Sequence, residues 1–295
     1  MHNKIIPIIF GGLGNQLFIY SANRNLSLVT GSDLLLDSLS GFKYDNYQRF
    51  YQLDHFNISA NKAKTKQLLY PFPRLQRKVL CKINSSRDFI NRNYIIQNGI
   101  DYDERFLKIK PRGTTFIEGY WQSENYFIQN ENIIRNDLQF KTQPNQSNQS
   151  LAEKIKSQNS VAVHFRFFDH PNTLSQNNAP LNYYKNAIDY IANKINHPHF
   201  FIFSDKPDLA NNFMKDFSHP YTLVTHNILE QDAVFDLWLM THCKHFVIAN
   251  STFSWWGGWL SQSKNKIIIS PSFKATGTTT AWNFKGLIPS SWIVI

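Results

Sequence analysis

Short runs of apolar residues alternate with longer amphipathic stretches along most of the chain. Runs of strand length occupy residues 5–10, 34–37, 114–117, 161–165, 199–204, 221–225, 246–249 and 266–270. Apolar residues recur at helical spacing over 17–29, 181–195, 208–217 and 233–241. Strands that alternate with helices are typical of βαβ units around a parallel sheet. The pattern therefore predicts an α/β protein.

One stretch interrupts this alternation near the middle of the chain. Residues 141–150 include no apolar side chain, and a polar segment of that kind is typical of a domain boundary. The chain of 295 residues also exceeds the usual size of one domain. We therefore expect two Rossmann-like domains, 1–145 and 146–295, with a cleft between them.

The composition permits packed cores and leaves the ligand class open. Apolar residues make up 42% of the chain and aromatic residues 15%, which argues against disorder. The formal net charge is +10, from 31 Lys and Arg against 21 Asp and Glu. Such a balance suits phosphate-bearing small molecules, anionic membranes or nucleic acid. Nucleic acid is the least favoured of these, because no known reading module is recognisable.

Cysteine content and the first residues indicate a cytoplasmic location. Cys81 and Cys243 are too few for a disulfide framework or a zinc cluster. The apolar run near the N-terminus is broken by Pro7, is too short to cross a membrane, and lacks a signal-peptide cleavage pattern.

A glycine-rich loop follows the first predicted strand. Residues 11–16 carry three glycines and lead into a helix, an order that lets backbone approach a ligand closely. The loop is not a dinucleotide fingerprint, because Leu17 stands where a third glycine is needed, and we exclude an NAD site. The alternative interpretation is that the glycines serve only the turn.

Residues 60–97 form the most basic region, in which Lys and Arg alternate with apolar residues at helical spacing. Such a segment can lie on an anionic lipid surface, or it can be the solvated face of an ordinary helix. Asp101 and Asp103 follow. Two isolated carboxylates are too few to define a divalent-metal site, so no metal is expected there.

A second polar and aromatic cluster comes after the strand at 114–117. Tyr120, Trp121 and Gln122 stand at its end, where they can stack on a sugar and hydrogen-bond to it. The alternative is that these aromatic side chains belong to the core.

Three strand ends in the second half carry polar groups. His164 and Arg166 share one face of a strand, since they are two residues apart, and Asp169 follows. Asp205 ends the next strand, and residues 250–254 form a hydroxyl-rich helix start. Ligands bind at the carboxyl ends of parallel strands, and helix N-termini suit phosphate. The sequence therefore predicts a cleft for a phosphorylated ligand, although each cluster alone can be a surface ion pair or a helix cap.

Five motifs together resemble the bacterial α1,2-fucosyltransferases, in the same order from residue 5 to about residue 275. They are Gly11–Phe18, Gly119–Glu124, His164–Asp169, Phe203–Asp205 and Cys243–Leu260. The resemblance implies a GT-B fold, GDP-fucose as donor, inversion at the anomeric carbon and no obligatory metal or other cofactor. It also implies a galactose-containing acceptor whose 2-hydroxyl is fucosylated.

The resemblance also implies roles for single residues. Arg166 matches the arginine on the β-phosphate, where it stabilises the departing GDP, and His164 matches a donor-site histidine. Asp205 matches a nucleoside-binding position. The phosphate-facing turn corresponds to Asn250, Ser251, Thr252, Phe253 and Ser254. In the N-terminal, acceptor-side domain, Gly14 and Asn15 match the loop that reaches the diphosphate and fucose.

One departure from the family pattern concerns the central motif. The common form has a second arginine directly after the first, whereas Phe167 and Phe168 separate Arg166 from Asp169 here. A paired guanidinium is therefore not expected. Asp169 is the candidate general base. The alternative is a dissociative route in which a phosphate oxygen takes the proton and Asp169 orients Arg166.

The acceptor is hypothesised to be a lipid-linked surface-polysaccharide or O-antigen unit, with peripheral contact at the inner membrane through the basic segment. Two other functions stay open at this stage. One is a non-catalytic protein that binds a nucleotide or carbohydrate, and the other is a transferase that uses a different GDP-sugar.

Overall fold

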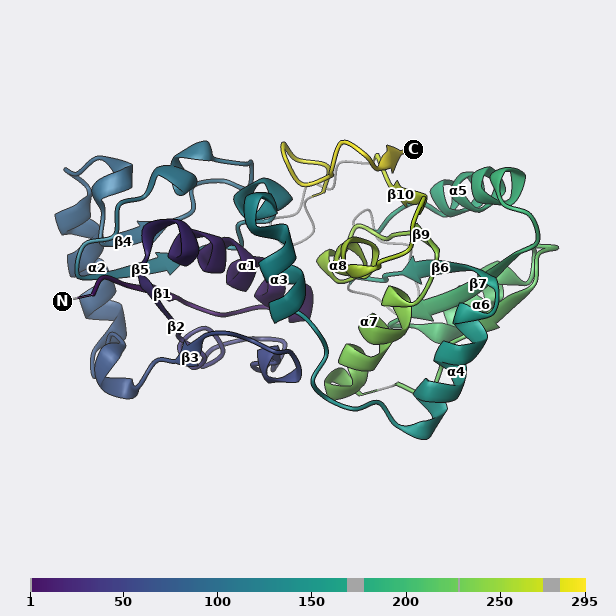
Figure 1. The fold of residues 1–295 in the computed structure, drawn as a ribbon, viewed down its shortest axis with the longest axis horizontal. Coiled ribbons are helices and arrows are strands. Elements are labelled where there is room, and N and C mark those ends of the chain that lie inside the picture. Colours follow the sequence, from purple (N-terminus) through teal and green to yellow (C-terminus); the bar gives the residue numbers. More distant parts are fainter. Residues whose placement is uncertain (1, 169–177, 228, 273–281) are drawn as a thin grey trace. The chain divides into compact units, whose positions relative to one another are not determined.

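A computed structural model describes residues 2–168, 178–227, 229–272 and 282–295. The chain forms two compact units, each a parallel sheet with helices (Figure 1). Unit 1 comprises the chain up to Lys141 together with Lys285–Leu287. Unit 2 comprises Thr142–Phe284 and Ile288–Ile295. Asp169, the candidate base, lies outside the described residues.

The sheet of unit 1 has five parallel strands in the order β3-β2-β1-β5-β4. Their bounds are β1 Lys4–Pro7, β2 Asp33–Leu36, β3 Asn61–Lys62, β4 Tyr94–Ile96 and β5 Thr114–Glu118. The α-helices are α1 Leu13–Thr30, α2 Pro73–Asn84 and α3 Glu131–Asp137. The central position of β1 places the glycine-rich loop that follows it at the carboxyl edge of the sheet.

Helix α1 begins inside the predicted glycine loop, four residues before the position expected from the apolar pattern. Gly12 is its N-cap with extended backbone, and Gly31 ends it with a left-handed φ of 63°. Glycine reaches that conformation without the steric cost that a Cβ imposes. Gly14 therefore belongs to the first turn of a helix.

The sheet of unit 2 has six parallel strands in the order β11-β10-β9-β6-β7-β8. They are β6 Asn159–Phe165, β7 Pro198–Ser204, β8 Tyr221–Leu223, β9 His245–Val247, β10 Ile268–Ser270 and β11 Ile293–Val294. The helices are α4 Gln146–Lys156, α5 Leu181–Lys194, α6 Pro207–Met214, α7 Ala233–Thr241 and α8 Thr252–Leu260.

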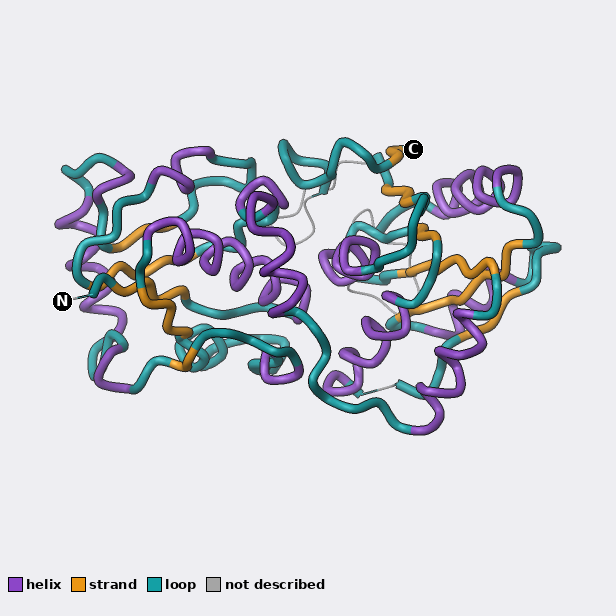
Figure 2. Tube along the Cα trace, viewed as in Figure 1, coloured by secondary structure: helices purple, strands orange, loops and turns teal. Residues whose placement is uncertain are grey.

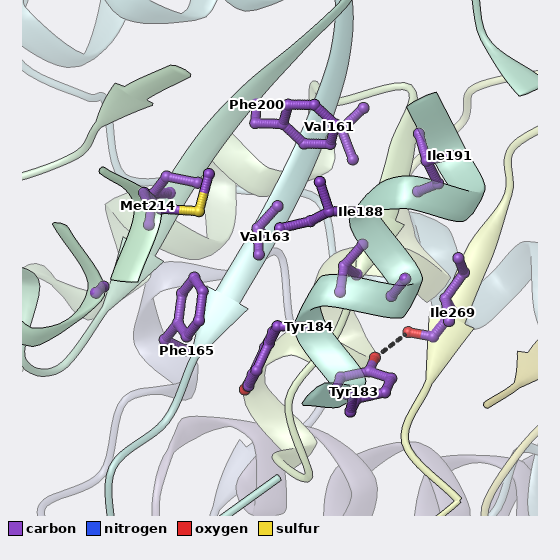
Figure 3. Close-up of a cluster of buried hydrophobic side chains, with 14 of the residues drawn as sticks. Val161, Val163, Phe165, Tyr183, Tyr184, Ile188, Ile191, Phe200, Met214 and Ile269 are labelled. Atoms are coloured by element: carbon purple, nitrogen blue, oxygen red, sulfur yellow. Dashed lines mark hydrogen bonds between the residues drawn. The ribbon is translucent and has the colours of Figure 1, made fainter. Parts of the chain in front are cut away.

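One core cluster of unit 2 joins helix α5 to the central strands (Figure 3). Val161, Val163 and Phe165 alternate along β6 and face the same side, where Ile188 of α5 is also fully buried. The buried hydroxyl of Tyr183 donates to the carbonyl oxygens of Ile248 at 2.7 Å and Ile269 at 2.8 Å. The helix is thereby fixed to the ends of β9 and β10.

The polar stretch 141–150, where we predicted a domain boundary, becomes helical from Gln146 (Figure 2). Helix α4 starts at Gln146, because the Asn145 side chain caps it by accepting from the Asn148 amide at 3.0 Å. Asn148 itself is fully buried and exchanges hydrogen bonds with Asn227 at 3.0 and 2.9 Å. Asn148, a buried residue of this segment, is therefore polar because it makes hydrogen bonds inside the protein.

Residues 285–287 belong to unit 1, and both acidic residues at 101 and 103 have partners within the protein. The Asp101 carboxylate accepts from the Lys285 amide at 2.9 Å, and Asp103 forms an ion pair with Arg105 at 2.7 Å. Hydrogen bonding to Arg105 lowers the pKa of Asp103. No group of three or more His, Cys, Asp or Glu suited to a metal occurs among the described residues. Within the same residues, no helix has the length and apolar character needed to span a bilayer.

Candidate functional site

Three neighbouring strands of unit 2 end beside one another. Strand β6 pairs with β7 on one side and with β9 on the other, in registers that align Phe165 with Ser204 and Val163 with Val247. His164 stands near the end of β6 and Arg166 directly after it, Asp205 follows β7, and residues 250–254 come after β9. The topology therefore gathers all three predicted clusters of unit 2 at one sheet edge.

Arg166 and Asp205 form an ion pair at this edge. The Arg166 Nη1 atom lies 2.8 Å from Asp205 Oδ2, and the side chains are 33% and 22% exposed. The second carboxylate oxygen accepts from the Phe167 amide at 3.0 Å, and the Arg166 guanidinium lies 5.1 Å from the centre of the Phe168 ring. Burial raises the pKa of Asp205, and Arg166 opposes that shift. Asp205, expected on a nucleoside, thus holds the guanidinium of Arg166.

His164 is buried one residue before the end of β6. Its side chain is near the Phe253 ring of α8, with 5.6 Å between ring centres, and the residue is 5% exposed. Burial, and secondarily the charge of Arg166, lowers the pKa of His164 to about 3. The imidazole is therefore neutral at pH 7. Its Nδ1 atom has no hydrogen-bond partner among the described residues.

The start of helix α8 forms the third part of the site. Ser251 is its N-cap, and the Ser251 hydroxyl accepts from the Phe253 amide at 3.3 Å. Ser254 is fully buried, and its hydroxyl donates to the Ser251 carbonyl at 3.3 Å. Both serines therefore build the cap, and the helix N-terminus brings partial positive charge to the sheet edge.

Tight packing fixes the position of α8. Trp255, Trp256 and Trp259 are buried along it. At Gly257 a Cβ would approach Met240 of α7 to within 3.0 Å, so a glycine permits the close contact of the two helices. A helix held in this way presents its N-terminus in a defined place.

Asn178 is a buried polar residue at this edge that the sequence analysis did not identify. Its Oδ1 atom accepts from the Phe168 amide at 2.8 Å, while its Nδ2 atom has no partner among the described residues. The adjacent Ala179 amide donates to Asn250 Oδ1 at 3.2 Å. Asn178 and Ala179 together thereby link the turn after β6 to the turn after β9. Its sequence context, a run of polar residues, gives no signal of this position.

In unit 1, the predicted residues meet around the start of α1. Asn15 Oδ1 accepts from Gln122 Nε2 at 2.9 Å, and Tyr120 packs on Phe10 with 4.6 Å between ring centres. The fully buried Gln16 fixes the loop, because its side chain donates to the carbonyls of Gly11 and Phe50 and accepts from the Gln52 amide. The role of Gln16 in holding the loop was not predicted.

Trp121 corrects the prediction of a sugar platform. Its side chain is fully buried and packs on Phe106 with 4.3 Å between ring centres. Trp121 therefore belongs to the core of unit 1. The turn that carries it is held by Gln97, whose Oε1 atom accepts from the amides of Tyr120 and Trp121 at 2.8 and 3.0 Å.

The fold is of the GT-B type, as predicted. It resembles the structure of a point mutant of Arabidopsis thaliana FUT1 in complex with GDP, with a TM-score of 0.55, 13% identity, and coverage of 99% of this chain and 76% of that one. It also resembles the fucosyltransferase NodZ from Bradyrhizobium, with a TM-score of 0.55, 16% identity, and coverage of 95% and 97%.

The protein belongs to glycosyl transferase family 11, whose model matches residues 5–292. Two similar proteins come from Escherichia coli. One is an α-1,2-colitosyltransferase, 28% identical over 91% of each chain. The other is the O-antigen biosynthesis glycosyltransferase WbnK, 28% identical over 96% of this chain and 97% of that one. The predicted family is confirmed.

Proposed function

We propose that this family 11 enzyme transfers L-fucose from GDP-fucose to the 2-hydroxyl of a galactose residue in a surface-polysaccharide unit, with inversion. The observation that carries the proposal is the arrangement of Arg166, Asp205 and the α8 N-terminus at adjacent strand ends. In the proposal unit 2 binds the donor and unit 1 faces the acceptor.

Arg166 acts on the leaving group in this mechanism. Breaking the bond between the fucosyl carbon and the β-phosphate oxygen leaves negative charge on GDP, and a fixed cation stabilises that charge. Asp205 keeps the guanidinium in place by the 2.8 Å contact. A guanidinium has five N–H donors, so one ion-pair contact does not exhaust its capacity for a diphosphate.

The other groups of unit 2 at this site carry no full charge, and they act on the donor through a partial charge or through hydrogen bonds. The N-terminus of α8, with Asn250 and Thr252 beside it, faces the diphosphate in the proposal. His164 acts as a neutral hydrogen-bonding group, because burial lowers its pKa to about 3. The uncommitted Nδ1 of His164 and Nδ2 of Asn178 are both suited to a bound polar ligand.

The acceptor proton has two possible destinations. As the bond from the acceptor oxygen to the fucosyl carbon forms, that oxygen loses its proton either to Asp169 or to a phosphate oxygen of the leaving GDP. Asp169 lies outside the described residues, so its role stays a prediction. On the acceptor side we assign Gln122 and Tyr120, while Asn15 and the backbone at Gly14 keep their predicted role toward the donor.

A second donor is favoured by one relative. The α-1,2-colitosyltransferase matches 91% of this chain, and colitose is L-fucose without its 3-hydroxyl. A site that hydrogen-bonds the 3-hydroxyl of fucose discriminates strongly against colitose, which lacks it. An apolar site at that position discriminates only weakly against fucose. Competition between GDP-fucose and GDP-colitose therefore distinguishes the two donors.

The test is release of GDP from each donor, with and without a panel of galactosides. We expect acceptor-dependent release with GDP-fucose and a loss of roughly a hundredfold or more in Arg166→Ala. Arg135→Ala is the matched control, since Arg135 also pairs with a carboxylate, Glu131 at 2.7 Å, but in unit 1. GDP binding without turnover on any galactoside would instead support a non-catalytic binder. Preferred use of GDP-colitose would refute fucose as the donor sugar and leave the proposed transferase activity standing.

A further inference from the structure

Helix α2 of unit 1 exposes an apolar stripe. Phe72, just before the helix, and Leu75, Val79 and Ile83 within it are 65%, 61%, 49% and 48% exposed. They recur at spacings of three and four residues, so they share one face. An amphipathic helix on a sheet normally turns its apolar face inward. Here that stripe faces solvent.

The opposite face of α2 already holds the helix on the sheet. Leu80 and Cys81 pack against the core cluster that includes Tyr94 and Phe116. Arg77 forms two hydrogen bonds of 2.8 Å with Glu118, and Asn84 bonds to Asn93 at 2.8 Å. Attachment to the sheet therefore does not account for the outward stripe.

The charges beside the stripe are all positive. Helix α2 contains no acidic residue, and Arg74, Lys78 and Lys82 are exposed on its surface. Arg77 pairs with Glu118, and the charges of Arg74, Lys78 and Lys82 therefore face an external partner. A partner that complements both features must be apolar and negatively charged. An anionic phospholipid surface has both properties.

Exposed aromatic residues extend the stripe at its N-terminal end. Tyr70 is 65% exposed, and Tyr44 is 67% exposed, with the Arg74 guanidinium 4.7 Å from its ring centre. Tyrosine is favoured at the boundary between headgroups and acyl chains. The helix has 12 residues and is about 18 Å long, which suits a position in the plane of the interface.

We propose that the outward face of α2 docks on anionic phospholipid bilayers. Phe72, Leu75, Val79 and Ile83 enter the headgroup boundary, while Arg74, Lys78 and Lys82 contact lipid phosphates. This inference does not depend on the donor sugar or on the chemistry at Arg166. It would bring unit 1 to the surface where a lipid-linked acceptor is held.

The test is flotation of the full chain with phosphatidylcholine vesicles, with and without 30% phosphatidylglycerol. We expect binding to the anionic vesicles only. Neutralising Arg74, Lys78 and Lys82 to Gln should weaken binding roughly a hundredfold. The control neutralises Lys66, Lys110 and Arg112, which are also exposed in unit 1. It removes the same charge and should have a much smaller effect.

A second pair of variants tests insertion of the stripe. Leu75→Gln with Val79→Gln should weaken binding at least tenfold. The control is Ile128→Gln with Ile133→Gln, at residues that are 41% and 38% exposed. Circular dichroism confirms that each variant is folded.

Three outcomes would overturn the proposal. The first is a wild-type chain that does not float with anionic vesicles. The second is a loss of vesicle binding that is equal in the α2 variants and in their controls. The third is full binding by the Leu75 and Val79 variant, which would mean charge adsorption without docking of the stripe. If the stripe instead joins two copies of the chain, sedimentation velocity will show a dimer that this variant dissociates. Each result is independent of GDP release.

Discussion

Two arginine–aspartate ion pairs have different surroundings in the two units. In unit 1, Asp137 accepts hydrogen bonds from Tyr20 at 2.6 Å, Arg24 at 2.8 Å and Ser59 at 2.6 Å, and its side chain is 2% exposed. In unit 2, Asp205 accepts from Arg166 and from the Phe167 amide, and both side chains are partly exposed.

The comparison shows how one pair of residue types serves two purposes. Around Asp137 every oxygen is used by the protein, so the pair closes a core. At the strand ends the guanidinium is oriented but accessible, and two buried polar atoms nearby, on His164 and Asn178, have no partner among the described residues. A site with uncommitted groups at the carboxyl edge of a sheet is suited to a ligand.

The largest expected effect comes from Asp137→Ala. The variant leaves the hydroxyls of Tyr20 and Ser59 and the charge of Arg24 without their acceptor in a buried place. We expect the free energy of unfolding to fall by about 3–5 kcal/mol, as for other buried pairs that lose one partner. Urea denaturation measures it.

Asp205→Ala is the matched comparison for that variant. Because Arg166 remains accessible to water, removing its partner should cost much less stability. Equal losses in the two variants would show that the pairs do not differ in the way proposed.

The same contrast separates what local sequence patterns can and cannot predict. The alternation of apolar runs predicts β6, β7 and α5 within one or two residues, because burial imposes periods of 2 and 3.6 on each segment. It also places Arg166, Asp205 and Asn250 at strand ends. It does not predict that Tyr20 meets Asp137, since 117 residues separate them and neither carries a local sign of the contact.

Other failures have a similar origin. Trp121 is read equally well as a ligand platform or as a core residue, and only the packing against Phe106 decides between them. Asn148 looks like part of a solvated linker, yet tertiary hydrogen bonds to Asn227 bury it. In each case the deciding contact comes from a segment distant in the chain.

A second prediction concerns the buried histidine beside Arg166. The folded-state pKa of His164 is about 3, below the ordinary value of 6.5, so the unfolded chain binds the proton more readily. The stability that a neutral His164 contributes is present above pH 6.5 and is lost as the pH falls below it. Between pH 6.5 and 5 this amounts to about 2 kcal/mol.

Thermal unfolding of the wild type and His164→Phe at several pH values measures this effect. As the pH falls from 7.5 to 5, the unfolding temperature of the wild type should fall relative to that of the variant. His55→Phe in unit 1 is the control, because burial lowers the pKa of His55 as well, but the residue is only half-buried. A difference for His164→Phe that is constant with pH would contradict burial as the origin of its low pKa.

The smallest expected effect on stability belongs to Asp205→Asn, whose single side-chain oxygen accepts either from Arg166 or from the Phe167 amide in place of the two carboxylate oxygens. Burial raises the folded-state pKa of Asp205, so the folded protein binds this proton more readily than the unfolded chain. The wild type therefore loses stability relative to the non-titrating variant as the pH rises through that pKa. At pH 7.5 the variant should melt at or slightly above the wild-type temperature.

Activity should respond in the opposite direction. With an amide in place of the carboxylate, Arg166 is oriented by a neutral group, and we expect acceptor-dependent GDP release to fall about tenfold through kcat. Asp137→Asn is the control for unit 1, where loss of the charge should lower the unfolding temperature without this specific change in kcat. A stable Asp205→Asn variant with reduced kcat would mean that Asp205 is retained to position Arg166 at the expense of stability. If the variant kept full activity, the ion pair at the strand ends would have no part in positioning the arginine.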